Sequence, residues 1–243
     1  MAYLSGKDCG YVFVDGVNVA VSNNALELSS EGVIPKRRVL GTVSKAAFPT
    51  GQVDSEIAIH GWLDADTSAQ LADMTGDPKV ISVLFGGNAI SQLFAGFKTA
   101  YVTGSSLGVS EDDIDSYEPV LVTSNCKASI GYVVAPYAAR TAAANTDAAD
   151  AARDAAEATS GTAYLHIAAL DLDGYTNLVI EVRHSSDGVT YADHTAFTAA
   201  TAVGAQTLAL AGAVNEYLSI SWAYTGEGTA PTWSGFVGVS VDG

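Results

Sequence analysis

Short apolar runs separated by turn-forming residues recur along most of this 243-residue chain. Residues 11–14 and 17–21 flank Asp15 and Gly16, a pair that accepts the positive φ angles of a type I′ turn, so we expect a β-hairpin there. Residues 80–85 form a short run rich in β-branched side chains, which predicts a strand buried on both faces. A chain built from such segments folds by pairing strands, and the prediction is an all-β fold.

The rest of the first half predicts more strands and one helix. Asp66 is a suitable N-cap for residues 64–74, and Gly76 and Pro78 end that segment, so we expect a short helix. Residues 29–53 contain two prolines and three glycines and predict a long loop. A turn-rich acidic connection is expected at residues 104–113. The expected strands are residues 24–28, 56–63, 94–103 and 114–124.

The composition changes near residue 138, where alanine becomes dense. Residues 138–160 favour a helix in isolation, and they are equally compatible with a linker that contains one poorly formed strand. We therefore divide the chain into a first domain (1–137), an Ala-rich linker (138–160) and a second β-sandwich domain (161–243). The strands expected in the second domain are residues 164–169, 178–183, 207–210, 216–224 and 233–241.

The net charge of −16 argues against a protein that binds the nucleic-acid backbone, because phosphate binding needs clustered Lys and Arg. The first residues lack the basic start and apolar run of a signal peptide, and no apolar stretch is long enough to span a bilayer. We expect synthesis and folding in a cytoplasm, with Cys9 and Cys126 as reduced thiols.

No arrangement of residues predicts catalysis or metal binding. The four histidines are scattered, and no nucleophile motif or phosphate-binding glycine loop accompanies them. His184, Asp187 and His194 lack the tight spacing of a zinc site. Residues 111–115 carry four carboxylates but do not match a calcium-binding loop, and a solvated acidic loop is the simpler interpretation. We expect a non-enzymatic protein without cofactors.

Charge is unevenly distributed along the chain. Lys36, Arg37, Arg38 and Lys45 are four of the eleven basic residues, and all four lie in the expected long loop. Residues 161–243 have eight acidic residues and a single basic one, Arg183. A basic loop on an acidic protein can attract another copy of the same chain head-to-tail, although a solvated surface loop is the alternative.

The order of elements resembles the tail tube proteins of siphophages. Residues 57–87, IAIHGWLDADTSAQLADMTGDPKVISVLFGG, resemble the strand–helix–strand unit of that family, and residues 91–125 resemble the strand, acidic turn and closing strand that follow it. Residues 162–197 and 214–222 resemble an Ig-like or carbohydrate-module-like β domain of the kind appended to phage structural proteins. The motifs consist of patterned strands rather than catalytic residues.

This resemblance implies a structural virion protein, assembled in the host cytoplasm, whose first domain forms stacked hexameric rings around a DNA conduit. It implies tape measure, tail terminator and tip proteins as partners, no membrane, and DNA that passes without specific binding. The second domain would decorate the outside of the tube. The implied inter-ring contacts are Pro35, Lys36, Arg37, Arg38, Lys45 and Phe48, and the implied lumen-facing acidic candidates are Glu56, Glu111, Asp112, Asp113 and Asp115.

A binding module is the alternative from another functional class. A capsid or tail decoration protein, or a glycan-binding adhesin, would act through the second domain, where aromatic rings can stack on sugars. The alternative role for the two tryptophans is core packing. The aromatic candidates are Tyr191, Trp222, Tyr224 and Trp233.

Overall fold

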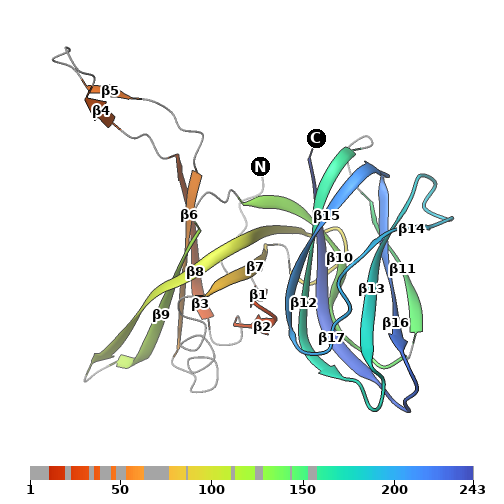
Figure 1. Ribbon diagram of the computed structural model, residues 1–243. Coiled ribbons are helices and arrows are strands. Elements are labelled where there is room, and N and C mark those ends of the chain that lie inside the picture. Colours follow the sequence, from red (N-terminus) through yellow and green to blue (C-terminus); the bar gives the residue numbers. More distant parts are fainter. Residues whose placement is uncertain are drawn as a thin grey trace. The chain divides into compact units, whose positions relative to one another are not determined.

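The computed structural model describes residues 11–19, 23–32, 36–38, 45–47, 53–62, 77–85, 87–110, 113–123, 128–142, 144–152 and 158–242. All regular elements in these ranges are β-strands, which confirms the predicted all-β class (Figure 1). The helix expected at residues 64–74 lies outside the described residues. Within the described ranges, no helix has the length and apolar character needed to cross a membrane.

The chain forms two compact units, and both are discontinuous in sequence. Unit 1 contains residues 1–21, 80–96 and 129–243, and unit 2 contains residues 22–79 and 97–128. The long strand β8 (Leu93–Ser110) contributes to both units.

Unit 2 contains four antiparallel strands paired in the order β3-β6-β9-β8. A second, two-stranded ladder of β4 and β5 lies between β3 and β6 in sequence. The bounds are β3 (Asn23–Gly32), β4 (Lys36–Arg38), β5 (Lys45–Ala47), β6 (Val53–Trp62) and β9 (Asp113–Thr123).

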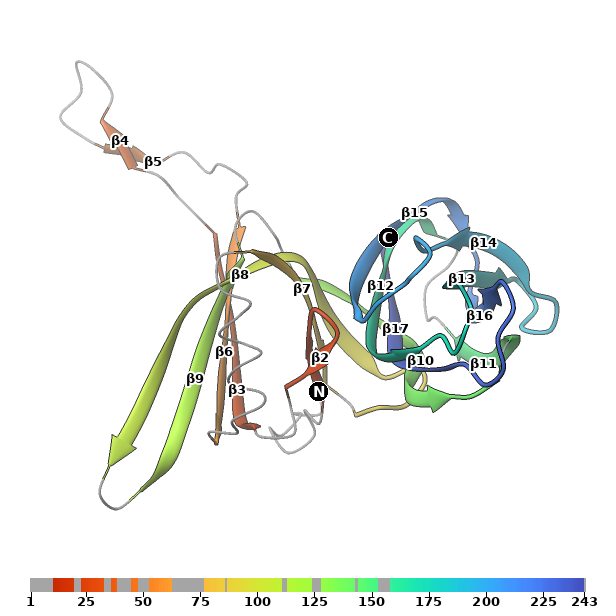
Figure 2. The same cartoon turned by 60° about the horizontal axis from the view of Figure 1, so that its bottom comes forward.

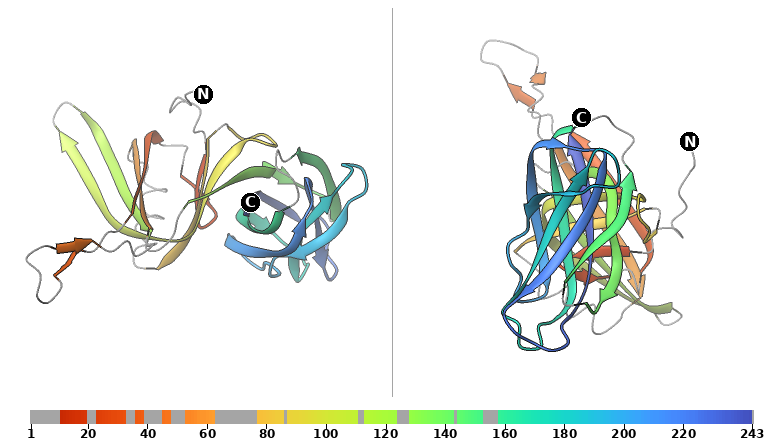
Figure 3. Two further views of the ribbon diagram at one scale, coloured as in Figure 1. Left: turned by 90° about the horizontal axis from the view of Figure 1, so that it is seen from above. Right: turned by 90° about the vertical axis from the view of Figure 1, so that its right-hand side faces the viewer.

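Unit 1 contains two sheets that curl around a common interior (Figures 2 and 3). One has the order β15-β12-β17-β10-β8-β7-β1-β2, and the other has the order β11-β16-β13-β14. The strands are β1 (Tyr11–Val14), β2 (Val17–Asn18), β7 (Pro78–Leu84), β10 (Ser129–Arg140), β11 (Ala144–Ala152), β12 (Ala158–Asp171), β13 (Asn177–Ser185), β14 (Ala192–Ala196), β15 (Gly204–Val214), β16 (Tyr217–Thr225) and β17 (Thr232–Asp242).

The inner core of unit 1 lies between its two sheets, as in a β-sandwich. Leu165 and Ile167 of β12 point into it from one sheet, and Ile180 of β13 and Ile220 of β16 point into it from the other. All four side chains are at most 2% exposed. This arrangement confirms the strands predicted after residue 161, which appear as β12, β13, β15, β16 and β17.

An outer core covers the opposite face of β12 and β17. Phe13 of β1 stacks on Phe236 of β17 with ring centroids 5.6 Å apart, and Phe94 of β8 meets Tyr164 of β12 edge-on at 5.5 Å. Leu84 of β7 belongs to the same buried cluster. Because successive side chains of a strand point to opposite faces, Tyr164 enters the outer core while Leu165 enters the inner one. The central strands are therefore buried on both faces.

The predicted N-terminal hairpin is confirmed, including its turn. Asp15 and Gly16 have φ values of 49° and 91°, as a type I′ turn requires. The strand predicted at residues 80–85 is also confirmed, because Ile81, Ser82, Val83 and Leu84 of β7 are all fully buried.

The domain boundaries expected at residues 137 and 161 differ from the units that the structure forms. Residues 11–19 and 80–96 pack with residues 129–242, because the outer face of β12 and β17 is apolar and β1, β7 and the start of β8 cover it. β10 also pairs with β17 and places Val134 and Ala135 in the inner core. No local feature of the sequence indicates that these separate segments form one unit, because their association depends on long-range strand pairing.

The stretch expected to be a helix or linker, residues 138–160, also differs. It contains the end of β10, all of β11 and the start of β12, and β11 pairs with β16. The helical preference of alanine is a fraction of a kcal/mol per residue, and strand pairing overrides it here.

Replacing Gly16 with Ala tests how closely the N-terminal turn approaches the main sheet. A Cβ at Gly16 would lie 2.6 Å from the Ile167 carbonyl oxygen, whereas a Cβ at Gly87, which has nearly the same φ (93° against 91°), would have nothing within 4 Å. We expect G87A to cost about 1–2 kcal/mol for backbone conformation alone, and G16A to cost about 2 kcal/mol more. Urea unfolding of the two variants measures this, and equal losses would show that the turn does not approach β12 closely.

Candidate assembly interface

The basic residues predicted to contact a neighbouring ring lie on a short β-ladder. Lys36, Arg37 and Arg38 form β4 and Lys45 begins β5, while Pro35 and Phe48 lie outside the described residues. The prediction of one long loop over residues 29–53 is wrong at these strands and also at residues 29–32 and 53, which belong to β3 and β6. At these positions the chain forms paired strands, because residues 36–38 and 45–47 are close enough in sequence to pair through their backbones.

The register of this ladder pairs two basic positions. Arg38 is the partner of Lys45, and Lys36 is the partner of Ala47. Like charges at directly opposite positions of an antiparallel pair destabilise it. Residues 32–53 contain no Asp or Glu, so this segment has no carboxylate of its own to compensate.

The acidic candidates divide between strands and undescribed residues. Glu56 lies on β6, where its backbone partners are Ser29 of β3 and Val122 of β9. Asp113 and Asp115 lie on β9, and Glu111 and Asp112 lie outside the described residues. The acidic connection expected at residues 104–113 is shorter than predicted, because β8 continues to Ser110 and Ser110 pairs with Asp113.

Two of the four aromatic residues proposed for sugar stacking are buried. Trp222 and Trp233 are 5% and 1% exposed, their rings meet edge-on at 5.8 Å, and the Trp222 indole N–H donates to the Ala142 carbonyl. Their role is core packing, so they cannot form a sugar platform. Tyr191 and Tyr224 are partly buried and come from separate segments.

Tyr224 packs against the inner core, and its ring lies 5.3 Å from that of Tyr175. Its hydroxyl is buried without a hydrogen-bond partner. Burial, together with the nearby Asp171 carboxylate, raises the pKa of Tyr224 to about 12. These contacts indicate a packing role rather than an exposed stacking surface.

Arg140 is a buried cation next to the two tryptophans, and the sequence did not predict this contact. The Arg140 guanidinium donates to the carbonyls of Pro136, Ala138 and Gly235, and its Cζ lies 4.4 Å from the centroid of the Trp233 ring. Carbonyl hydrogen bonds and a cation–π contact of this kind stabilise a buried guanidinium. The spacing of Arg140 from the two tryptophans in sequence gives no signal of the contact.

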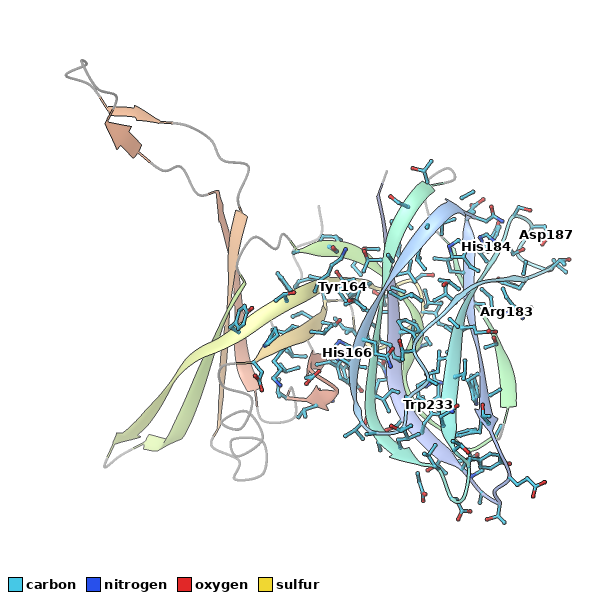
Figure 4. All side chains as sticks on the ribbon, viewed as in Figure 1. Tyr164, His166, Arg183, His184, Asp187 and Trp233 are labelled. Carbon is cyan, nitrogen blue, oxygen red and sulfur yellow. The ribbon has the colours of Figure 1, made fainter. Side chains whose placement is uncertain are left out.

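His184 lies on β13 (Figure 4), and its ring centroid is 4.7 Å from that of His194 on β14. His184 Nδ1 accepts a hydrogen bond from the Asn215 backbone N–H, and burial followed by the charge of His194 lowers the pKa of His184. The Asp187 carboxylate does not join them. It accepts hydrogen bonds from the Thr190 backbone N–H, from Ser185 Oγ and from the Val189 backbone N–H, and these lower its pKa to about 2.

Within the ranges that the structure describes, no group of three or more His, Cys, Asp or Glu residues is placed to hold a metal ion. His184 and His194 therefore form a ring contact, whereas the Asp187 carboxylate accepts hydrogen bonds from backbone N–H groups two and three residues later in its own turn.

His166 of β12 is a fully buried titratable group. Its ring lies 5.4 Å from that of Phe13, its Nδ1 accepts from the Gly16 N–H at 3.2 Å, and its Nε2 lies 3.0 Å from Ser82 Oγ. Because Nδ1 is an acceptor, the proton of the neutral ring is on Nε2, which donates to Ser82. His166 therefore connects β12 to the N-terminal turn and to β7, and both of its nitrogens are occupied structurally.

No family model matches this chain, and no curated protein matches it. Among solved structures, a chain in the tail of an empty gene transfer agent particle with C6 symmetry aligns with 15% identity and a TM-score of 0.38, covering 53% of this chain and 97% of that one. A chain in the virion of the native gene transfer agent particle aligns with 14% identity and a TM-score of 0.36, with the same coverage. The Dit (gp 19.1) protein of phage SPP1 aligns with 11% identity and a TM-score of 0.26, covering 95% of this chain and 99% of that one. At these TM-scores and identities, the likeness assigns neither a fold family nor a function to this chain.

The burial of His166 predicts a loss of stability in acid. Burial lowers the pKa of His166 from 6.5 to about 3, so the unfolded chain binds a proton between these pH values and the folded chain does not. Stability therefore falls as the pH drops through this window, and between pH 7 and pH 4 we expect this residue to contribute a loss of about 3 kcal/mol.

Urea unfolding of wild type and H166Q at both pH values checks this. The glutamine amide can replace both hydrogen bonds and does not titrate, so the variant should lose about 3 kcal/mol less than wild type on acidification. Equal losses in the two proteins would show that His166 is not buried in its neutral form.

Proposed function

We propose that this chain is a structural subunit of a bacteriophage tail, which assembles with copies of itself into the tail tube as stacked hexameric rings. The subunit acts as a conduit wall and has no catalytic role. The observation that carries this proposal is the segregation of charge: a β4–β5 ladder with four basic residues belongs to a chain whose net charge is −16.

This distribution of charge favours contact between unlike surfaces of identical copies. The register pair of Arg38 and Lys45 gains stability when carboxylates of a neighbour approach it. The chain has 27 Asp and Glu residues to supply them. A head-to-tail contact of this kind does not use the same surface twice, so it can repeat along a stack of rings.

The conduit role follows from the excess of negative charge. A wall with few cations does not retain the DNA backbone, because that binding depends on neutralising phosphates. We propose Glu56, Glu111, Asp112, Asp113 and Asp115 as the residues that line the channel. Tape measure, tail terminator and tip proteins are the partners proposed for the two ends and the interior of the tube, and the virion tail is the proposed location.

Reversing the charge of the ladder should weaken assembly. We expect K36E/R37E/R38E to remain folded and to sediment mainly as isolated subunits or single rings under conditions where wild type forms larger assemblies. The Debye screening length is about 8–10 Å near physiological salt and shortens as salt is added. The assembly of wild type should therefore also decrease as the ionic strength rises.

The matched control is K7E/K98E/K127E, which changes the net charge by the same amount at other positions. Sedimentation velocity compares the two triple variants with wild type. If both variants assemble as well as wild type, the ladder is not the inter-ring contact. If both fail equally, net charge rather than the ladder controls assembly.

A further inference from the structure

The edge strand β15 differs from the rest of this acidic chain in having no charge. No charged residue occurs between Asp193 and Glu216, which is the longest such interval in the sequence. β15 lies at the end of its sheet, and among the described strands it pairs only with β12 (Figure 2). An edge strand offers backbone N–H and C=O groups to another strand.

Residues 205–211 of β15 lack most of the features that usually protect an edge. A register shift in the pairing with β12 lies beyond them, between Ala211 and Val214. Proteins block such edges with lysine, proline or an inward-pointing charge, and β15 contains none of these. Leu208 and Leu210 pack toward the inner core, while Thr207, Ala209 and Ala211 alternate with them and are exposed. Small side chains at these positions leave room for a neighbouring strand. The amide of Gln206 is already used, because it donates to the Thr198 carbonyl.

The charge of the chain indicates which strand fits this edge. Two copies with a net charge of −16 repel each other over most of their surfaces, and the repulsion is weakest where neither copy carries charge. Antiparallel pairing of β15 with itself places uncharged residues opposite uncharged residues along the whole contact. A two-fold contact of this kind uses the same patch on both partners and closes after two copies.

We propose that residues 205–211 of β15 pair antiparallel with the same residues of a second copy, joining two β12–β17–β10 sheets into one continuous sheet. This contact is separate from the ladder of β4 and β5 and does not depend on the proposed tube. It would link subunits pairwise through unit 1.

Disulfide trapping in the full chain tests the pairing. Cys9 and Cys126 are first replaced by serine. T207C and A209C are then introduced together, because two-fold pairing of residues 205–211 places residue 207 of one copy opposite residue 209 of the other. Directly opposite residues of an antiparallel pair have Cα atoms about 4.5–5.5 Å apart, which suits a disulfide, so T207C/A209C should form a covalent dimer on mild oxidation. V189C is the control, because Val189 is 82% exposed and lies outside β15.

We expect the trapped dimer to form at least tenfold faster than the V189C dimer, and we expect T207K/A209K to weaken the non-covalent dimer at least tenfold in sedimentation equilibrium. Crosslinking of T207C/A209C no faster than that of V189C would overturn the proposal, as would an unchanged dimer in T207K/A209K. Tubes without crosslinks would overturn the pairing and leave the tube intact, whereas crosslinked dimers without tubes would support the pairing alone.

Discussion

The burial of β12 and β17 on both faces is the constraint on which unit 1 depends. One face contributes Leu165 and Val237 to the inner core, and the other contributes Tyr164 and Phe236 to the outer core. Each fully buried large apolar side chain stabilises a fold by about 1.5–3 kcal/mol. Without β1, β7 and the start of β8, the outer face would expose the aromatic rings of Tyr164 and Phe236 to water. The first residues of the described chain and the last therefore belong to one folded unit.

His166 shows how this dual burial is achieved at a polar position. Its imidazole lies on the outer face of β12, and the two ring nitrogens hydrogen-bond to the Gly16 backbone N–H and to Ser82 Oγ. A buried polar group is tolerated when its hydrogen bonds are made, and here they join three separate segments of the chain. The absence of a side chain at Gly16 permits that approach, since a Cβ there would collide with the Ile167 carbonyl.

The sequence predicted local structure well and long-range organisation poorly. The turn at Asp15 and Gly16, the buried strand of residues 80–85 and the strands after residue 161 follow from turn chemistry and short apolar runs, which are local signals. The pairing of β10 with β17 and of β11 with β16 is not encoded in any one segment, so alanine-rich strands were expected to be a helix or linker. The sequence gives no signal of the Arg140 contacts, and it leaves Trp222 and Trp233 open between core packing and sugar stacking, for the same reason: their contacts join segments about 80–95 residues apart.

The proposed assembly depends on two features of the charge distribution, a basic ladder and an uncharged edge strand. Basic residues are concentrated on β4 and β5, and β15 lies within the longest uncharged interval. Electron microscopy of the concentrated purified protein tests the central claim most directly. The account predicts hollow tubes or stacked rings with a central channel and six-fold end views. Solid fibres without a channel, or particles that remain single subunits at every concentration, would contradict it.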